Sequence, residues 1–383
     1  MVGTRSGTAA LIGLRQNCGR GGDYCRRPPR RKCLPFVSRG PTLAGMRTAP
    51  CYLLAIILLA PPLATGPALA ADSVKPDDIL AGLRDFHTKT AKSDGSFRPG
   101  IDPEYEGMSD SAASDLAPVT YAVVIHKTFG WKLPDEKKTV AFLQGRQKED
   151  GAFVNVAGTN DPKTPSARVY NTTQGLVALH ALGAKPRYDP LPVFEEVMKA
   201  DYKDLPPYST SFFPLAYRAA GATWPKEFDR RVRALMVQAD DGYLNDHIAA
   251  TFHAAHYYAL LGEPTPRAAA IVKRALHDQK PDGSWLLNPP ARDRHATFDA
   301  VFTLKHLGGD SAECGKAIDK AAEWALSCRN KDGGFGHLPG SPSAADAIYF
   351  QVGVLVMAGV LKPAEPRPSD AELLGWGHLM PVR

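Results

Sequence analysis

The chain contains the stretch Gln279-Lys280-Pro281-Asp282-Gly283-Ser284-Trp285, which decides its fold. Its core is an Asp-Gly pair with an aromatic or apolar residue two positions after the Gly. A signature that recurs at long and fairly even spacing indicates a repeat architecture. The widest interval, 91 residues between the second and third copies, is about twice the others and predicts a degenerate copy near Asp201. The five pairs begin at Asp94, Asp150, Asp241, Asp282 and Asp332.

A second signal, the glycines that end apolar stretches, gives the number of repeats. Gly ends a helix by accepting the left-handed conformation, and a Pro shortly afterwards prevents the helix from continuing. Six apolar stretches end at a Gly, five of them with a Pro within four residues, and the mean spacing of about 46 residues matches a two-helix repeat. The chain is therefore predicted to hold six repeats of two helices each. The six glycines are Gly130, Gly183, Gly221, Gly262, Gly308 and Gly359.

The two helices of each repeat differ in polarity. The segment 265–276, which precedes an Asp-Gly loop, is amphipathic, whereas the segments 174–182 and 351–358, which follow such loops, are apolar all round. A helix with one apolar face lies at the surface, while a helix that is apolar all round is buried. Six outer and six inner helices in alternation predict an all-α fold, a closed (α/α)6 toroid over residues 71–363 with a C-terminal tail at 364–383. An open solenoid is disfavoured because it would expose the inner helices.

The Asp-Gly loops are predicted to be structural. Asp-Gly favours a tight turn with positive φ, and the aromatic residue that follows is expected to wedge between neighbouring repeats. Gln147, Gln238 and Gln279 precede the Asp by three residues and are expected to bond nearby backbone groups. A calcium loop is disfavoured, because no copy has the alternating Asp or Asn ligands and the terminal Glu that such loops use.

The first 70 residues are predicted to be separate from the toroid. Residues 46–70 combine Arg47, an apolar core too short to span a bilayer, and the small-residue pattern Ala68-Leu69-Ala70. This order is typical of a secretory signal peptide, here cut after Ala70, so we expect a secreted or periplasmic protein with no transmembrane span in the mature chain. Residues 1–45 are basic and without helical or strand period, which fits a start codon placed too far upstream, an organelle presequence or a disordered tail.

The charge balance argues against nucleic acid as a partner. The whole chain has a formal net charge of +6, but residues 1–70 hold ten of its 46 Lys and Arg and one of its 40 acidic residues. The remaining 36 basic and 39 acidic residues leave the mature chain slightly negative. Proteins that bind nucleic acid generally carry a basic surface, which this balance does not suggest.

Several stretches resemble known families. Residues 279–285 resemble the Gln…Asp-Gly-x-Trp repeat of squalene–hopene and oxidosqualene cyclases, and Cys328–Gly336 resembles the matching repeat of protein prenyltransferase β subunits. Asp115–Ala122 resembles the first inner helix of the same subunits. The resemblance covers the whole mature chain and implies the α/α toroid. The cyclases protonate their substrate with an Asp-x-Asp-Asp motif, which this chain does not contain.

The prenyltransferase resemblance also implies a metal position. Those subunits bind zinc through Asp-x-Cys at the start of an inner helix and a His on the next, and the zinc converts a substrate thiol into a thiolate. The matching positions here hold Asp293, His295 and Tyr349. Asp293 and His295 are both zinc ligands by type, so zinc is the cofactor that the resemblance implies there, whereas Tyr349 replaces the family's His. The residues alone also fit a helix cap at Asp293 and a polar His295 at the mouth of the ring.

The same resemblance implies residues for a prenyl diphosphate. The family's diphosphate-binding His matches His247, while its Arg and Lys positions hold Leu287 and Pro290. Arg292 and Arg294 lie close by and are the expected substitutes, since a diphosphate needs several charged donors. The substrate-binding residues expected from the resemblance are His247, Arg292, Arg294 and Tyr349.

Two classes of function follow from these observations. The first is an exported protein similar to prenyltransferases and terpene cyclases, which binds or acts on an isoprenoid in its central cavity and would be a transferase if active. The alternative is a non-catalytic toroid that binds a ligand or partner, or a carbohydrate-active toroid. An aromatic lining of the inner ring favours an isoprenoid, whereas acids with exposed Trp favour a carbohydrate. The sequence does not identify catalytic residues.

Overall fold

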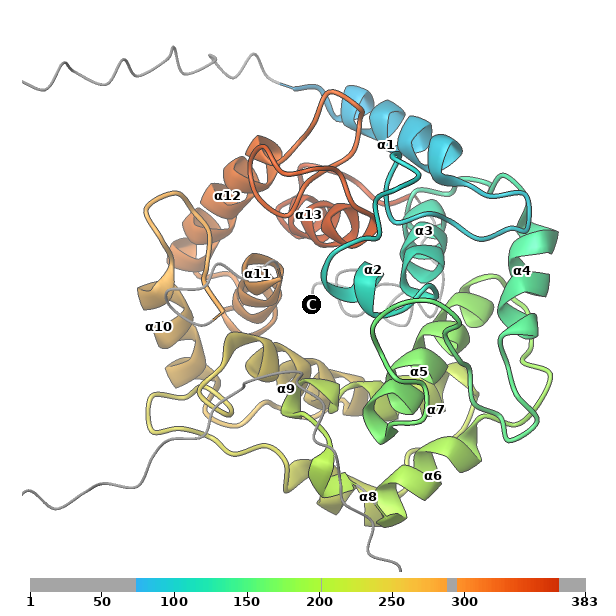
Figure 1. Cartoon of the computed structure of the whole chain (residues 1–383). Helices are drawn as coiled ribbons and strands as arrows, with labels where there is room; N and C mark the ends of the chain where they lie inside the picture. The colour runs from blue at the N-terminus through green and yellow to red at the C-terminus, as the bar shows by residue number, and fades with distance from the viewer. Residues whose placement is uncertain (1–73, 201, 288–294, 365–383) are drawn as a thin grey trace, which may run out of the picture. The chain divides into compact units, whose positions relative to one another are not determined.

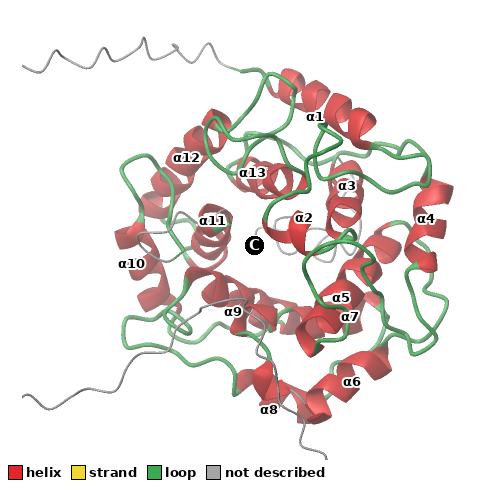
Figure 2. Ribbon diagram, in the orientation of Figure 1, coloured by secondary structure: helices red, strands yellow, loops and turns green. Residues whose placement is uncertain are grey.

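A computed structural model describes residues 74–200, 202–287 and 295–364, all of which belong to the unit Leu69–Arg383. Every regular element in these residues is a helix (Figure 2). The long helices alternate along the chain between an outer and an inner position, as Figure 1 shows. The all-α toroid that the repeats predict is confirmed. The predicted extension 1–45, the signal peptide 46–70, Asp201 and the tail beyond residue 364 lie outside the described residues.

The helices have the following bounds. The outer helices are α1 (Pro76–Thr90), α4 (Glu136–Gly145), α6 (Leu191–Ala200), α8 (Lys226–Arg233), α10 (Ala268–Asp278) and α12 (Ala312–Ser327). The inner helices are α3 (Ala117–Thr128), α5 (Pro165–Ala181), α7 (Phe212–Ala219), α9 (Ile248–Leu261), α11 (Ala296–Leu307) and α13 (Ala345–Met357). A short helix α2 (Ser109–Ala113) and the 3₁₀ turns η1 (Tyr202–Asp204) and η2 (Pro207–Ser209) complete the described elements.

The inner helices form a closed ring. Each packs against the next in the order α3, α5, α7, α9, α11 and α13, and α13 packs against α3. Closure leaves no open end at which an apolar inner helix would meet solvent, which is the physical reason for preferring a toroid over a solenoid.

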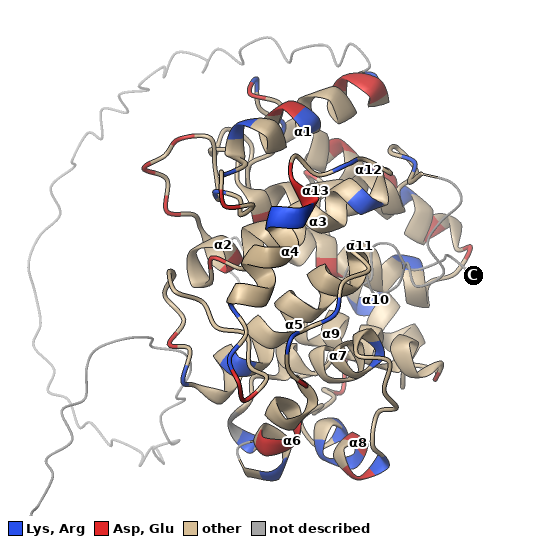
Figure 3. Ribbon diagram, turned by 90° about the vertical axis from the view of Figure 1, so that its right-hand side faces the viewer, with Lys and Arg blue, Asp and Glu red and all other residues tan. Residues whose placement is uncertain are grey.

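Burial follows the polarity that the sequence predicts. Every residue of α13 is buried except Val356, whereas the outer helix α8 buries Phe228 and Val232. Charged residues accordingly gather on outer helices such as α1 and α8 (Figure 3). In the described residues no helix is long and apolar enough to cross a membrane.

The Asp-Gly loops join neighbouring repeats, and the loop at Asp282 shows how. The Asp282 carboxylate accepts a hydrogen bond from the Ser284 amide at 3.0 Å, which holds the turn. The Gln279 side chain donates to the Gly283 carbonyl at 3.1 Å and to the Ala317 carbonyl of α12, the next outer helix, at 2.8 Å. Trp285 is buried and its indole nitrogen donates to the carbonyl of Ala275 at 2.7 Å. The predicted structural role of these loops is confirmed.

The loop glycines also close the outer ring. Gly333, in the last loop, has φ +87° and lies against Gly82 of α1, so that a methyl group on Gly333 would come within 2.5 Å of the Gly82 carbonyl oxygen. The Arg329 guanidinium donates to the Asp78 carbonyl at 2.8 Å in the same place. The last repeat therefore packs directly on the first helix.

Candidate active site

The short helix α2 brings an acidic side chain to the ends of the inner helices. After the outer helix α1 the chain turns inward to α2, which packs against α3 and α13 and lies inside the ring in Figure 1. Its first residue, Ser109, has φ +52°, a conformation that non-glycine residues rarely adopt. The Ser109 hydroxyl contacts Nε2 of His295, beside the start of α11, and the Ser111 amide donates to Asp346 of α13 at 3.3 Å. These contacts fix the position of Asp110 between them.

Asp110 is a half-buried carboxyl group that is hydrogen-bonded to the inner ring. The Tyr121 hydroxyl of α3 donates a hydrogen bond to Oδ2 of Asp110. Burial raises the pKa of Asp110 and the neighbouring charge of Asp346 adds to this effect, although His295 and the bond from Tyr121 act in the opposite direction. The Asp110 carboxyl therefore keeps its proton to a higher pH than an exposed aspartate, as a proton donor must.

Asp346 is a second carboxyl group with the opposite tendency. It is fully buried at the start of α13 and accepts hydrogen bonds from Nε2 of His337 at 3.0 Å and from the Ala347 amide at 2.9 Å. Burial acts to raise the pKa of Asp346, but the hydrogen bond and charge of His337, with smaller contributions from His295 and the Ser111 amide, outweigh it and lower the pKa. Two nearby carboxyl groups whose pKa values are pushed apart are a common arrangement for an acid and an anion at an active site.

Three tyrosines, Tyr121, Tyr170 and Tyr349, face Asp110. They belong to a set of aromatic side chains that come from all six inner helices. We call this set the aromatic belt: Tyr121, Tyr170, Phe212, Phe252, Phe298, Tyr349 and Phe350.

The rings of the belt follow one another around the inner ring. Tyr121 stacks on Tyr349 with centroids 4.4 Å apart, Tyr349 meets Phe298 at 5.8 Å, and Phe298 meets Phe252 at 5.4 Å. His253 of α9 continues the series, since its ring lies 4.9 Å from that of Phe252 and 5.1 Å from that of Phe212. Phe212 lies 5.9 Å from Tyr170. The belt thus runs from α3 round to α5 as a series of rings in contact, most of them buried.

The structure places three of the residues predicted for the site. His295 lies with its ring 4.0 Å from that of Phe350, and Tyr349 is part of the belt, so these two predicted residues come together. His247 is the N-cap of α9, where its side chain accepts from the Ala250 amide at 3.4 Å. Its charge also contributes to lowering the pKa of His253, after burial and His256. Arg292, Asp293 and Arg294 lie outside the described residues.

The described residues do not fit a zinc site. Tyr349, at the position of the family's third ligand, is stacked on Tyr121, and Nε2 of His295 is engaged by Ser109. No group of three or more His, Cys, Asp or Glu suited to a metal occurs in residues 74–200, 202–287 and 295–364. We therefore derive no step through zinc.

Sequence reasoning did not select Asp110, Asp346 or His337 as site residues. A signal for Asp346 was present, because a charged residue within a helix that is apolar all round is costly to bury and often functional. Asp110 lies in a polar stretch before the first inner helix, so an acidic residue there does not stand out from its neighbours in the sequence. His337 follows the last Asp-Gly loop, which the repeat pattern explained as structural.

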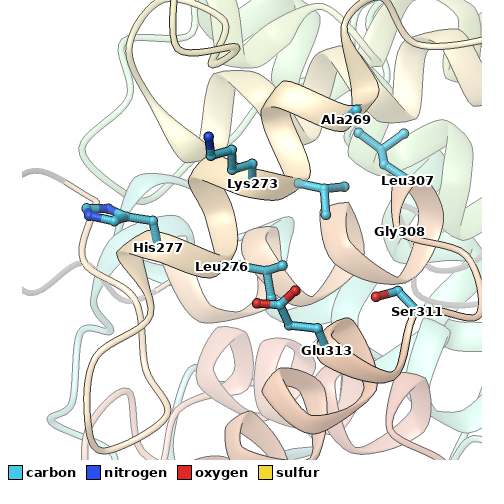
Figure 4. A pocket seen from close by; sticks show the side chains of 9 residues that line it. Ala269, Lys273, Leu276, His277, Leu307, Gly308, Ser311 and Glu313 are labelled. Atoms are coloured by element: carbon cyan, nitrogen blue, oxygen red, sulfur yellow. The ribbon is translucent and has the colours of Figure 1, made fainter.

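A surface groove elsewhere is a weaker candidate. It has a volume of about 530 Å³ and is lined by Lys273 and His277 of α10, Leu307 of α11, and Ser311 and Glu313 near the start of α12 (Figure 4). The groove lies at the C-terminal end of α11, whereas Asp110 and His295 lie at its N-terminal end, about 18 Å away for a helix of 12 residues. No buried acid or aromatic cluster lines it, so we place the candidate site at the aromatic belt.

Comparison with known proteins shows the family of this chain. The family model of the prenyltransferase alpha-alpha toroid domain matches residues 63–186 and 206–378, well over half of the chain. The chain belongs to this family. A curated relative, the geranylgeranyl transferase type-2 subunit beta of Candida albicans, is 30% identical over 107 residues, which span 28% of this chain and 30% of the relative.

Among solved structures, one aligns with a TM-score above 0.5. The protein geranylgeranyltransferase-I of Candida albicans, solved with GGPP, aligns with a TM-score of 0.52 at 11% identity, over 72% of this chain and 95% of that one. A type II terpene cyclase from Scytonema aligns with a TM-score of 0.46 at 15% identity, over 68% of this chain and 82% of that one. At these identities the likeness concerns the fold alone.

Proposed function

We propose that this toroid binds an isoprenoid against its aromatic belt and transforms it by an acid-initiated reaction in which Asp110 donates the proton. The observation that carries the proposal is the position of the Asp110 carboxyl, hydrogen-bonded to Tyr121, which is itself a member of the belt. A lining of Tyr and Phe suits a hydrocarbon chain and does not have the exposed Trp expected of a carbohydrate site. The relatives named above include a geranylgeranyl transferase subunit and a structure that holds GGPP, which makes a C20 prenyl chain the first probe.

The chemistry follows from the groups that are present. The O–H bond of Asp110 breaks and its proton forms a C–H bond with one carbon of an alkene, whose π electrons supply the pair. The neighbouring carbon becomes a carbocation and Asp110 a carboxylate. Ring faces such as those of Phe298 and Tyr349 stabilise a nearby cation by about 0.5–2 kcal/mol each. Capture of the cation by another alkene of the chain, and then loss of a proton to the carboxylate, returns Asp110 to its acid form.

The decisive experiment measures binding and proton transfer separately. The purified protein is titrated with geranylgeranyl diphosphate and with geranylgeraniol by calorimetry, and the same probes are incubated with it in D₂O and analysed by mass spectrometry for deuterium on carbon. We expect binding, deuterium uptake in the wild type, and a loss of uptake of about 10²- to 10⁴-fold in Asp110→Asn. Deuterium uptake that Asp110→Asn leaves unchanged contradicts the role of Asp110.

The alternatives give different results in the same assays. Release of inorganic diphosphate without deuterium uptake indicates prenyl transfer, and binding with neither reaction indicates a non-catalytic toroid. If neither prenyl probe binds but an oligosaccharide does, the protein is carbohydrate-active. Stoichiometric zinc in the purified protein would reopen the metal position at Asp293 and His295.

Export is part of the proposal. It rests on the signal-peptide pattern of residues 46–70. N-terminal sequencing of the protein from its native cells checks it, with Ala71 as the expected first residue. A chain that begins before residue 46 contradicts it.

A further inference from the structure

A buried acid–histidine pair lies beside the proposed proton donor. Asp346 is 0% exposed and His337 is 1% exposed, and Nε2 of His337 donates to Oδ1 of Asp346 at 3.0 Å. An ionised carboxylate is costly to bury and persists where hydrogen bonds and a positive partner compensate for the loss of water. Asp346 has these compensations, since the backbone amides of Ala347 and Ser111 also donate to it.

The loop that carries His337 is held by several bonds. Asn330 donates to the Ser341 carbonyl and to the Ser343 hydroxyl, both at 2.9 Å, and the Ser343 hydroxyl donates to Asp332 at 2.7 Å. A methyl group on Gly336 would lie 2.3 Å from the Ser341 carbonyl oxygen, so the loop is also closely packed. His337 is therefore fixed by the last Asp-Gly loop, far in sequence from the segment that it serves.

We infer that Asp346 and His337 form a positioning pair, which holds α2 through the Ser111 amide and keeps the carboxylate of Asp346 beside Asp110. The inference rests on the proposed function, because it assigns a role only if Asp110 is the proton donor. Ser111 follows Asp110 directly in α2, so a bond from its amide to a fixed carboxylate limits the movement of the Asp110 backbone. The contact between Ser109 and His295 holds the other side of the same turn.

Asp346 and His337 have opposite electrostatic effects on Asp110, since the charge of His337 lowers the pKa of Asp110. The groups that face Asp110 are Tyr121 from α3, Tyr170 from α5, His295 beside α11, Asp346 and Tyr349 from α13, and His337 from the preceding loop. Among them, the carboxylate of Asp346 raises the pKa of Asp110, after the larger effect of burial. A carboxylate at Asp346, which accepts the hydrogen bond from His337, thus favours the protonated form of its neighbour.

Asp346→Asn separates this role from a merely structural one. The amide oxygen of Asn still accepts from the Ser111 amide, but the negative charge is gone. We expect the Kd for geranylgeranyl diphosphate to stay within about 2-fold of the wild type while deuterium uptake falls by about 10-fold or more, in the lower part of the range for lost acid catalysis. The high-pH limb of the rate profile, set by loss of the Asp110 proton, should also move to lower pH.

A second variant keeps the test decisive if Asp346→Asn does not fold, as judged by circular dichroism. His337→Gln retains a side-chain amide donor but removes the imidazole that bonds to Asp346, and the same split between Kd and rate is expected. Equal losses in Kd and rate, or a rate profile whose high-pH limb does not move in the folded variants, overturn the inference. Deuterium uptake that is unchanged in Asp110→Asn overturns the proposed function itself. Failure of this inference and failure of the proposed function are therefore distinguishable.

Discussion

Closure of the outer ring makes a prediction that can be worked out in detail, at the contact between Gly333 and Gly82. Gly333 has φ +87° and Gly359, after α13, has φ +77°, so alanine is strained by a similar amount at both positions, about 1–2 kcal/mol. Only Gly333 has a close neighbour: a methyl group there would lie 2.5 Å from the Gly82 carbonyl oxygen, whereas nothing lies within 4 Å of one on Gly359. Overpacking adds about 1–3 kcal/mol.

The expected free-energy losses are therefore about 2–5 kcal/mol for Gly333→Ala and about 1–2 kcal/mol for the matched control Gly359→Ala. The effect of alanine on the unfolded chain is the same in both and cancels in the comparison. For a domain of about 290 residues the entropy of unfolding is about 0.6 kcal/mol per kelvin. Tm should then fall by about 3–8 °C for Gly333→Ala and by about 2–3 °C for the control, measured by circular dichroism at 222 nm.

For Gly82→Ala the expected change in stability is opposite to the usual effect of replacing glycine by alanine in a helix. Alanine in a helix interior is normally more stable than glycine by about 1 kcal/mol. A methyl group on Gly82 would lie 2.8 Å from the Cα of Gly333, so we expect a loss of stability instead. Equal Tm values for Gly333→Ala and Gly359→Ala, or a gain of stability in Gly82→Ala, would refute the reasoning that the last repeat packs on the first helix.

Two further predictions concern stability. Gln279→Leu leaves the carbonyls of Gly283 and Ala317 without their shared donor and should cost about 1–3 kcal/mol in urea unfolding, whereas a change near zero would contradict the bridging role. His87 is buried with its ring 4.9 Å from that of His126; burial, and then the charge of His126, lowers the pKa of His87 below 6.5. The unfolded chain therefore binds the proton more readily, and the stability that this group contributes is present above about pH 6.5 and falls by about 1.4 kcal/mol per unit as the pH decreases below it. His87→Leu should flatten this acid-side slope, with His277→Leu, whose side chain is 83% exposed, as the control.

The repeat pattern predicted the fold because each of its signals is local. A glycine after an apolar stretch, a proline beyond it and an Asp-Gly turn each follow from the conformations of a few residues. The polarity of segments such as 351–358 then decides which helices lie inside, since burial depends on the apolar surface of the helix itself. Helix α2 was not predicted because five residues are too few to show a helical period. Its first residue, Ser109, has a φ of +52°, and no glycine or proline at that position indicates such a turn in the sequence.

Part of the site could be predicted in the same way. His295 and Tyr349, taken from the prenyltransferase resemblance, both contact the ring of Phe350. They can do so because His295 directly precedes α11 and Tyr349 lies near the start of the neighbouring helix α13. The role assigned to His247 depended on a side chain reaching a ligand, and in the structure that side chain caps α9. A residue's place along a repeat thus follows from sequence, whereas the direction of its hydrogen bonds does not.

The sequence by itself determined six helix pairs, their inner and outer order and the loops that join them, because these depend on neighbours in the chain. Only the tertiary structure decided which acids meet. The amide of Ser111 and the carboxylate of Asp346 are separated by 235 positions, and His337 comes from a loop that belongs to the last repeat. They come together because the ring closes and places α13 against α2 and α3. The electrostatic effect of Asp346 on Asp110 is a product of that closure, since the interaction between two charges strengthens as the distance between them falls.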